Sequence, residues 1–250
     1  MVLQRENDPN RAAAFRRLDH PELFASRIFS GKDLDGVMRA DHGHAYFLPT
    51  AEGTDRGGDG RLTHVTVVAS DGFGWADGGD VGAVGELAAL GSLRSLRVGD
   101  LDLRVQLVGL GRPSDFRCPL FGEARTWVSA TPFVVTRHLK RRGRRRDPSE
   151  WFGPGGRTEF VRAVVSEEWA RRSSDVRPTV EVIQPTAVRE RLGWPFAPWA
   201  FGRGRARPGD DGLTRPHAAI CLRFEKPVAG PINLGYAAHF GLGQFVPAPI

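Results

Sequence analysis

Cysteine is scarce in this sequence: its 250 residues include only two, Cys118 and Cys221, and neither lies in a Cys-x-x-Cys or a Cys/His ligand spacing. The missing ligand spacing argues against a zinc site, and a structural disulfide is not expected in a reducing compartment. We therefore expect no metal and no cofactor, and we expect both cysteines to be small core residues.

Long hydrophobic runs are missing as well. No apolar run approaches the roughly 18 residues needed to cross a bilayer, and the N-terminal residues carry no hydrophobic signal core. These absences predict a cytoplasmic protein that has no membrane partner.

Positive charge, in contrast, is concentrated in one segment, residues 137–146, which we call the arginine run. It holds seven Lys and Arg side chains, and no acid follows until Asp147. Because the whole chain has a formal net charge of +6, everything outside the run sums to −1. Such a localised excess is typical of a chain that holds phosphates at one place. A solvated charge run or a localisation signal is the alternative interpretation.

Strand-like patterns recur along the chain in two sets, separated by a Gly- and Pro-rich break around residues 109–119. In the first set we expect a helix at 81–96 and strands at 45–49, 62–69 and 101–108. In the second set we expect a helix at 158–172 and strands at 126–135, 179–183, 218–225 and 244–246.

Each set suits a helix packed on one face of an antiparallel sheet. We therefore predict an α+β fold of two ferredoxin-like (RRM-like) modules in tandem, residues 1–112 and 113–250. Sheets of this type are often used to bind RNA.

A glycine-rich segment near the C-terminus, residues 230–245, reads Gly-Pro-Ile-Asn-Leu-Gly-Tyr-Ala-Ala-His-Phe-Gly-Leu-Gly-Gln-Phe. Glycine has no Cβ, so it adopts a positive φ at little cost and leaves its amide N–H open to phosphate oxygens. The segment therefore predicts a C-terminal loop in which Gly235, Gly241 and Gly243 bind the RNA backbone and read little base sequence.

Five runs, spaced in order over nearly the whole chain, carry a resemblance to a known family: residues 29–36, 42–49, 62–65, 127–138 and 235–245. They resemble the CRISPR RNA-processing half of the fused Cas-five/Cas-six subunit of subtype I-G (earlier I-U) systems. That family belongs to the RAMP superfamily of tandem ferredoxin-like folds, whose C-terminal glycine-rich loop grips RNA. Two departures are visible: the relatives carry a further backbone-subunit-like half ahead of this region, and Ala237 stands where a glycine is expected.

The resemblance implies a metal-independent endoribonuclease that cuts precursor CRISPR RNA within each repeat and leaves a 2′,3′-cyclic phosphate. Family members usually remain bound to the product in the surveillance complex. The implied partners are therefore the repeat hairpin of precursor CRISPR RNA and the other subunits of the effector complex.

Metal-free RNA cleavage needs a base for the 2′-OH proton and a group that stabilises the developing charge, and histidine suits proton transfer because its pKa lies near neutrality. His44, at the mouth of the first expected strand, is the favoured base, with His42 as the alternative. His44 is also open to a purely structural role, capping the strand or bonding the preceding loop. A His-x-His metal pair lacks a third ligand nearby.

The C-terminal loop offers His239, either as the acid or as a donor to a phosphate oxygen; packing against Phe240 is the structural alternative. Lys32 is a candidate for transition-state charge. The residues expected to bind RNA, besides the three loop glycines, are Arg137, His138, Lys140, Arg141, Arg142, Arg144, Arg145 and Arg146.

Two other functions stay open from the sequence. A non-catalytic RNA-binding subunit that caps the hairpin of a guide RNA needs the same arginine run and glycine loop, so only the histidines separate it from a nuclease. A general RNA-associated basic protein needs no ordered histidines.

The arginine run generates a first prediction. Replacing Arg141, Arg142, Arg144 and Arg145 with Ala should weaken RNA affinity and flatten its dependence on salt. Each lost phosphate contact lowers the single-strand log–log slope by roughly 0.7. Equilibrium binding at several salt concentrations measures the slope, and an unchanged slope would mean that the run is a solvated tail.

Overall fold

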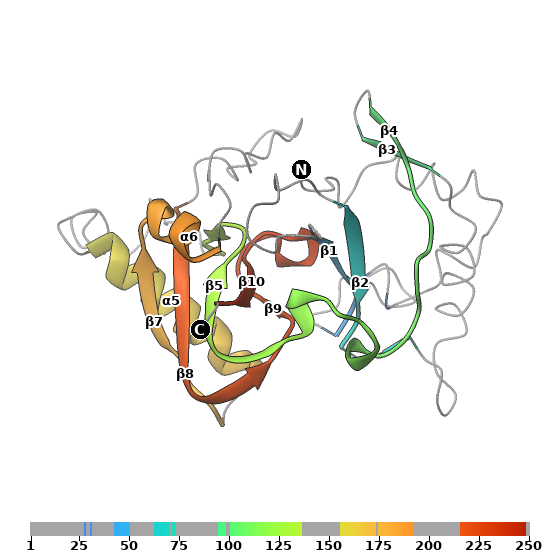
Figure 1. The fold of residues 1–250 in the computed structure, drawn as a ribbon. Coiled ribbons are helices and arrows are strands. Elements are labelled where there is room, and N and C mark those ends of the chain that lie inside the picture. The colour runs from blue at the N-terminus through green and yellow to red at the C-terminus, as the bar shows by residue number, and fades with distance from the viewer. Residues whose placement is uncertain are drawn as a thin grey trace. The chain divides into compact units, whose positions relative to one another are not determined.

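A computed structural model of the chain (Figure 1) describes residues 28, 31, 43–50, 63–70, 72–73, 95–98, 101–136, 156–173, 175–192 and 216–248. The chain divides into two compact units. One comprises Met1–Val2, Pro49–Val65 and Pro113–Ile250, and the other comprises Leu3–Leu48 and Thr66–Arg112. One boundary between these units lies between residues 112 and 113, as in the expected division, but residues 49–65 belong with the C-terminal part. The expected organisation into two modules stays a prediction.

The largest sheet has six strands, all paired antiparallel, in the order β6-β8-β5-β10-β9, with β7 also pairing with β8. The strands are β5 (Glu123–Ser129), β6 (Phe133–Val134), β7 (Thr179–Ile183), β8 (His217–Ala229), β9 (Ile232–Asn233) and β10 (Gln244–Pro247). The expectation of a mixed α+β chain with antiparallel sheets is confirmed.

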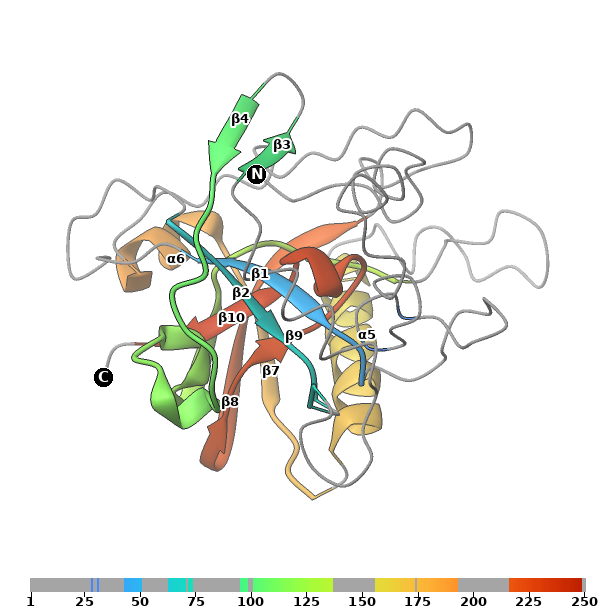
Figure 2. The ribbon, with the colours of Figure 1, turned by 90° about the vertical axis from the view of Figure 1, so that its right-hand side faces the viewer.

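Helix α5 (Gly156–Arg172) lies along one face of this sheet (Figure 2). It connects β6 to β7, and β8 lies between β5 and β7, so β5, α5 and β7 form a split β-α-β unit. Val161, Val164, Val165 and Trp169 recur at the spacing of one helical face and are buried. They pack against sheet residues that include Trp127, Phe133, Leu222, Ile232 and Phe245.

The opposite face of the sheet has a smaller core under α6 (Pro185–Leu192), a helix that the sequence pattern did not predict. Val188 of α6 packs there with Val128, Ile183, Ala219 and Cys221. Cys221 is therefore the small core residue that was expected, whereas Cys118 is only half-buried.

The expected strand at 126–135 is interrupted. Its two parts, β5 and β6, both pair with β8, β5 along residues 221–229 and β6 at residues 217–218. The chain departs from the ladder at Ala130–Pro132, where the amides of Ala130 and Thr131 donate to the carbonyl of Gln244 instead. We call residues 130–132 the strand break.

Two smaller sheets complete the described strands. β1 (Tyr46–Thr50) pairs with β2 (His64–Val68), and β3 (Ser95–Val98) pairs antiparallel with β4 (Leu101–Arg104). Two expectations need correction here: residues 95–96 are strand rather than the end of a helix, and the strand expected at 101–108 ends at Arg104. The pairing of Val98 with Leu101 leaves only Gly99 and Asp100 between the strands, a length typical of tight hairpins. Residues 81–94 lie outside the described part of the chain.

Short 3₁₀ helices, η2 (Pro113–Asp115) and η3 (Pro119–Phe121), lead from β4 to β5. Among the helices that the structure describes, none has both the length and the apolar character required to span a membrane.

A buried serine in the large sheet provides a test of the fold. Ser129 is 0% exposed, and its Oγ accepts a hydrogen bond from the amide of Ile220 at 2.8 Å. Ser129→Ala leaves this buried N–H without a partner and should lower the free energy of unfolding by about 1–3 kcal/mol. Ser114→Ala, at an exposed serine, is the control and should change it by less than about 0.5 kcal/mol. Denaturant unfolding measures both, and equal stabilities would contradict the assigned role of Ser129.

Candidate functional site

The C-terminal loop between β9 and β10, residues 234–243, is a folded structure of its own, which we call the glycine loop. It contains the short 3₁₀ helix η5 (Ala238–Phe240). Gly235, Gly241 and Gly243 have φ of 97°, 84° and 58°, values that glycine adopts far more easily than other residues.

The amides of these glycines are bonded within the protein. Gly235 N donates to Oε2 of Glu168 at 2.6 Å, Gly243 N donates to the carbonyl of Pro132 at 2.8 Å, and Gly241 N donates to the carbonyl of Ala238 at 3.2 Å. The expectation that they present open N–H groups to phosphate is therefore wrong.

Close packing explains the glycines instead. A Cβ on Gly243 would lie 1.6 Å from the carbonyl oxygen of Leu234. A Cβ on Gly235 would lie 2.6 Å from the carbonyl oxygen of Val134, and one on Gly241 would lie 2.4 Å from Cδ of Pro49. All three distances are shorter than real Cβ contacts, so the loop can fold this tightly only with glycine at these positions.

Ala237, where the resemblance leads one to expect glycine, adopts the left-handed conformation with φ 58° and ψ 27°. It is the one non-glycine residue with a positive φ in the part of the chain that the structure describes. Its carbonyl accepts the amides of Phe240 at 2.9 Å and Leu242 at 3.3 Å. The backbone thus keeps a glycine-type conformation at this position, at a cost of roughly 1–2 kcal/mol for an L-residue.

The strand break holds the C-terminal side of the loop. The Thr131 hydroxyl, on a residue only 8% exposed, donates to the carbonyl of Gly241 at 2.7 Å and accepts the amide of Gln244 at 2.9 Å. Because a hydroxyl is both donor and acceptor, one threonine satisfies both backbone groups.

Helix α5 holds the N-terminal side. Besides the bond from Gly235 to Glu168, the guanidinium of Arg172 donates to the carbonyls of Pro231 and, at 3.4 Å, Asn233. Glu168 and Arg172 are one turn apart, so both reach the same stretch of backbone from one side of the helix.

His239 lies within η5, and its side chain is half-buried, while its neighbour Phe240 is only 8% exposed. The loop also joins the end of β6, because Tyr236 N donates to the carbonyl of Val134 at 2.7 Å. The arginine run, with His138 and all its predicted RNA-binding cations, lies outside the described residues.

His44 belongs to the other unit and precedes β1 by two residues, at the strand mouth where it was expected. Its ring lies against the backbone of Gly31: a Cβ there would be 2.8 Å from Cδ2 and 3.0 Å from Nε2 of His44. The amide of Ala45 donates to the carbonyl of Ile28 at 2.7 Å, which ties the two segments together. Lys32 follows Gly31 directly, and both Lys32 and His42 lie outside the described residues.

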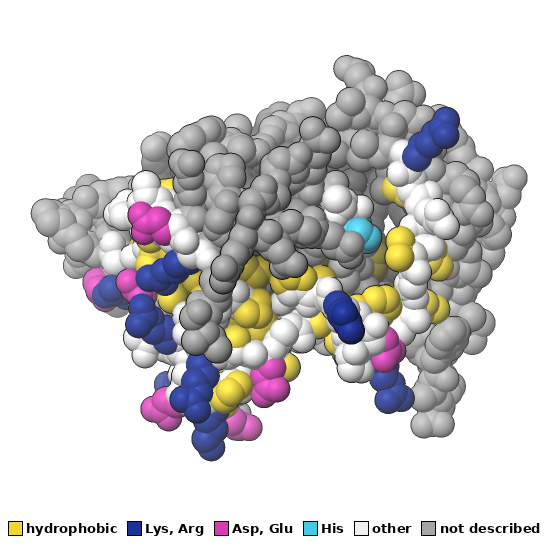
Figure 3. Space-filling model, viewed as in Figure 1, with side chains coloured by type: hydrophobic (Ala, Val, Ile, Leu, Met, Phe, Trp, Pro, Cys, Tyr) yellow, Lys and Arg dark blue, Asp and Glu magenta, His cyan; other side chains and the backbone are white. Residues whose placement is uncertain are grey.

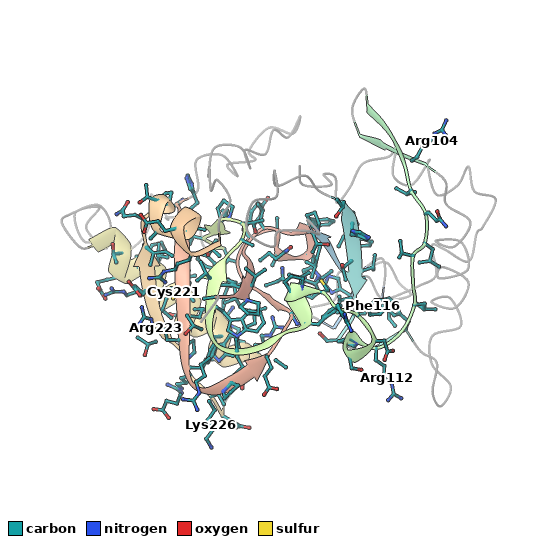
Figure 4. All side chains as sticks on the ribbon, viewed as in Figure 1. Arg104, Arg112, Phe116, Cys221, Arg223 and Lys226 are labelled. Atoms are coloured by element: carbon teal, nitrogen blue, oxygen red, sulfur yellow. The ribbon has the colours of Figure 1, made fainter. Side chains whose placement is uncertain are left out.

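The described charged surface carries both signs. Figure 3 shows basic and acidic side chains side by side over the region of β7 and β8, where Arg223 pairs with Glu181 at 3.0 Å. The hydrogen bond and charge interaction with Cys221, followed by the attraction of the Glu181 carboxylate, raise the pKa of Arg223 above its usual value. Arg223 and Lys226 both extend from β8 in Figure 4. Paired with an acid, Arg223 adds little to an excess of positive potential.

Metal-ligating side chains do not gather in the described ranges: no three His, Cys, Asp or Glu residues lie close enough together there to hold an ion. Comparison with known proteins gave no match to any protein-family model, curated protein or solved structure.

The close packing of Gly243 generates a prediction with a matched control. Gly243→Ala should destabilise the protein, because the methyl group collides with a backbone carbonyl in addition to straining φ. Gly72 has a φ of 73°, and a methyl group at this position would meet nothing within 4 Å. Gly72→Ala should therefore cost only the left-handed strain, about 1–2 kcal/mol.

We expect the loss for Gly243→Ala to exceed that of the control by a further 1–3 kcal/mol, roughly the cost of overpacking a core. Thermal or denaturant unfolding of both variants provides the comparison. Equal losses would show that Gly243 is needed for its φ alone.

Proposed function

We propose that the chain is a metal-independent endoribonuclease of the RAMP superfamily, which cleaves precursor CRISPR RNA within its repeats and stays bound to the product. The observation that carries the proposal is the junction of the glycine loop with the end of β6, the strand that leads into the arginine run.

The junction lies close in sequence to the arginine run. Tyr236 N bonds the carbonyl of Val134 at 2.7 Å, and the arginine run begins three residues after Val134.

A second arginine-containing stretch of the sequence precedes a residue that lies at the end of β6. The amide of Val135 donates to the carbonyl of Pro216 at 3.0 Å. Four arginines, Arg203, Arg205, Arg207 and Arg215, occur in the 15 residues before Pro216. A strand end next to which two arginine-containing stretches stand in the sequence suits a polyanion better than a small ligand.

The strand order supports the family assignment. The order β10-β5-β8-β7 with a split β-α-β unit is the order expected of a ferredoxin-like module, and in our proposal the glycine loop stands where such a module has its second helix. The N-terminal ferredoxin-like module is part of the proposal and rests on the sequence pattern.

In the proposed reaction His44 takes the proton of a 2′-OH, and the 2′-oxygen attacks the adjacent phosphorus. The bond from phosphorus to the 5′-oxygen breaks, and the leaving oxygen takes a proton from a general acid. The products are a 2′,3′-cyclic phosphate and a 5′-hydroxyl. Lys32, next to the glycine that the His44 ring touches, would stabilise the negative charge on the phosphate oxygens.

A non-catalytic RNA-binding subunit is the second candidate, and one observation favours it. The ring of His44 is packed against Gly31, which also suits a histidine that only fixes the loop before β1. In such a subunit the arginine run and the glycine loop would bind RNA, and His44 would not act as a base.

Cleavage of the cognate repeat RNA in EDTA separates the two candidates. We expect cleavage to persist and to leave a 2′,3′-cyclic phosphate, because the nucleophile is internal to the RNA. His44→Ala should lower the rate by roughly 10²- to 10⁴-fold with nearly unchanged RNA affinity. His239→Ala should reduce affinity as well as rate.

His64→Ala, at a histidine on β2 that bonds Thr63 Oγ1 at 2.9 Å, is the control and should cut at the wild-type rate. Dependence on added Mg²⁺, a 3′-hydroxyl product, or a folded His44→Ala protein with full activity would contradict the mechanism. Binding without any cleavage would favour the second candidate.

A further inference from the structure

The outer edge of β9 is closed by side chains rather than by another strand. β9 pairs with β10 through Ile232, and Leu234 N donates to the carbonyl of Gly243. Backbone groups of alternate residues point to opposite edges of a strand, so Pro231, Asn233 and Gly235 face the other way. Their bonds on that edge go to Arg172 and Glu168 of α5.

The two side chains have complementary chemistry for a strand edge. A guanidinium only donates, and it serves the carbonyls of Pro231 and Asn233. A carboxylate only accepts, and it serves the amide of Gly235. The bond from Gly235 to Glu168 is short, 2.6 Å, as expected when the acceptor is charged.

Gly235 is also the point at which the glycine loop meets β6. A Cβ there would lie 2.6 Å from the carbonyl oxygen of Val134 and 2.9 Å from the ring of Phe133. The next amide, that of Tyr236, bonds the same carbonyl. A shift at Gly235 therefore changes the position of the loop relative to the strand that leads into the arginine run.

We propose that Glu168 is a positioning residue for RNA binding: by holding Gly235 it fixes the glycine loop relative to the end of β6. This proposal rests on the proposed function. Without the carboxylate, Gly235 N loses this acceptor, and the bonds from Arg172 hold only the residues before the loop, Pro231 and Asn233. RNA that contacts the loop must then restore its position on binding, which lowers affinity.

Three variants of α5 distinguish the loss of this hydrogen bond from the loss of a negative charge. Glu168→Ala, Glu168→Gln and Glu167→Ala each remove one negative charge, so their general electrostatic effect on RNA is the same. Glu167 is exposed, whereas Glu168 is half-buried. The amide oxygen of Gln still accepts a hydrogen bond, so Glu168→Gln is the conservative rescue.

Two measurements are made on each full-length variant. The rate of amide hydrogen exchange of residues 234–243, measured without RNA, reports how firmly the loop is held. Equilibrium binding of a fluorescein-labelled oligouridine reports RNA affinity, because backbone contacts do not depend on base sequence.

We expect Glu168→Ala to speed exchange in the loop and to weaken oligouridine binding by roughly tenfold relative to Glu167→Ala, the effect of losing one charge-assisted hydrogen bond. Glu168→Gln should stay within about threefold of Glu167→Ala in both measurements.

The proposal is overturned if Glu168→Ala matches Glu167→Ala in affinity. If Glu168→Ala then still speeds hydrogen exchange in the loop, Glu168 only protects the edge of the sheet. If exchange is also unchanged, the bond from Gly235 to Glu168 does not hold the loop. If the wild-type protein binds no RNA, the proposed function fails first, and the positioning role fails with it.

Discussion

The described fold depends most on the contact between Gly243 and the carbonyl of Leu234, where a Cβ would come within 1.6 Å of the oxygen. This contact closes the loop between β9 and β10 and sets the pairing of Gln244 with Asn233. β10 in turn pairs with β5, the central strand of the sheet. A residue other than glycine at this position would disturb the loop and β10 together.

The glycine loop is thus held from two sides. The strand break supplies the Thr131 hydroxyl and the carbonyl of Pro132, while α5 supplies Glu168 and Arg172. If RNA binds here, the glycine amides already have partners, so the ligand must be held by side chains and by the shape of the loop. Our proposal assigns the positive charge to the arginine run, which follows β6 in the sequence.

Periodicity predicted the elements that bury a regular apolar face. Helix α5 was expected at 158–172 and is found at 156–172, because its valines and Trp169 recur at helical spacing. Strand β7 matches its expected range, 179–183. Helix α6 was missed because its eight residues bury little apolar surface, although Pro185 at its first position is a helix-start signal. The β3–β4 hairpin was missed because the helical spacing of the preceding leucines was extended through Leu96.

The sequence predicted which residue types form the candidate site, but not the contacts that explain them. The glycine positions were found, but their role in close packing depends on the carbonyls of Val134 and Leu234, which lie on other segments. Nothing in the sequence pointed to Thr131, Glu168 or Arg172, because a hydrogen bond to distant backbone leaves no local pattern. The positive φ of Ala237 agrees with the glycine that was expected at this position.

The central claim is that the glycine loop and the arginine run hold the same RNA. Photocrosslinking of a repeat RNA carrying 4-thiouridine, followed by mass spectrometry of the attached peptides, tests it most directly. The account predicts crosslinks in both residues 234–243 and residues 137–146, and their joint loss when unlabelled repeat RNA competes. Crosslinks in only one of these segments, or only elsewhere in the chain, would contradict it.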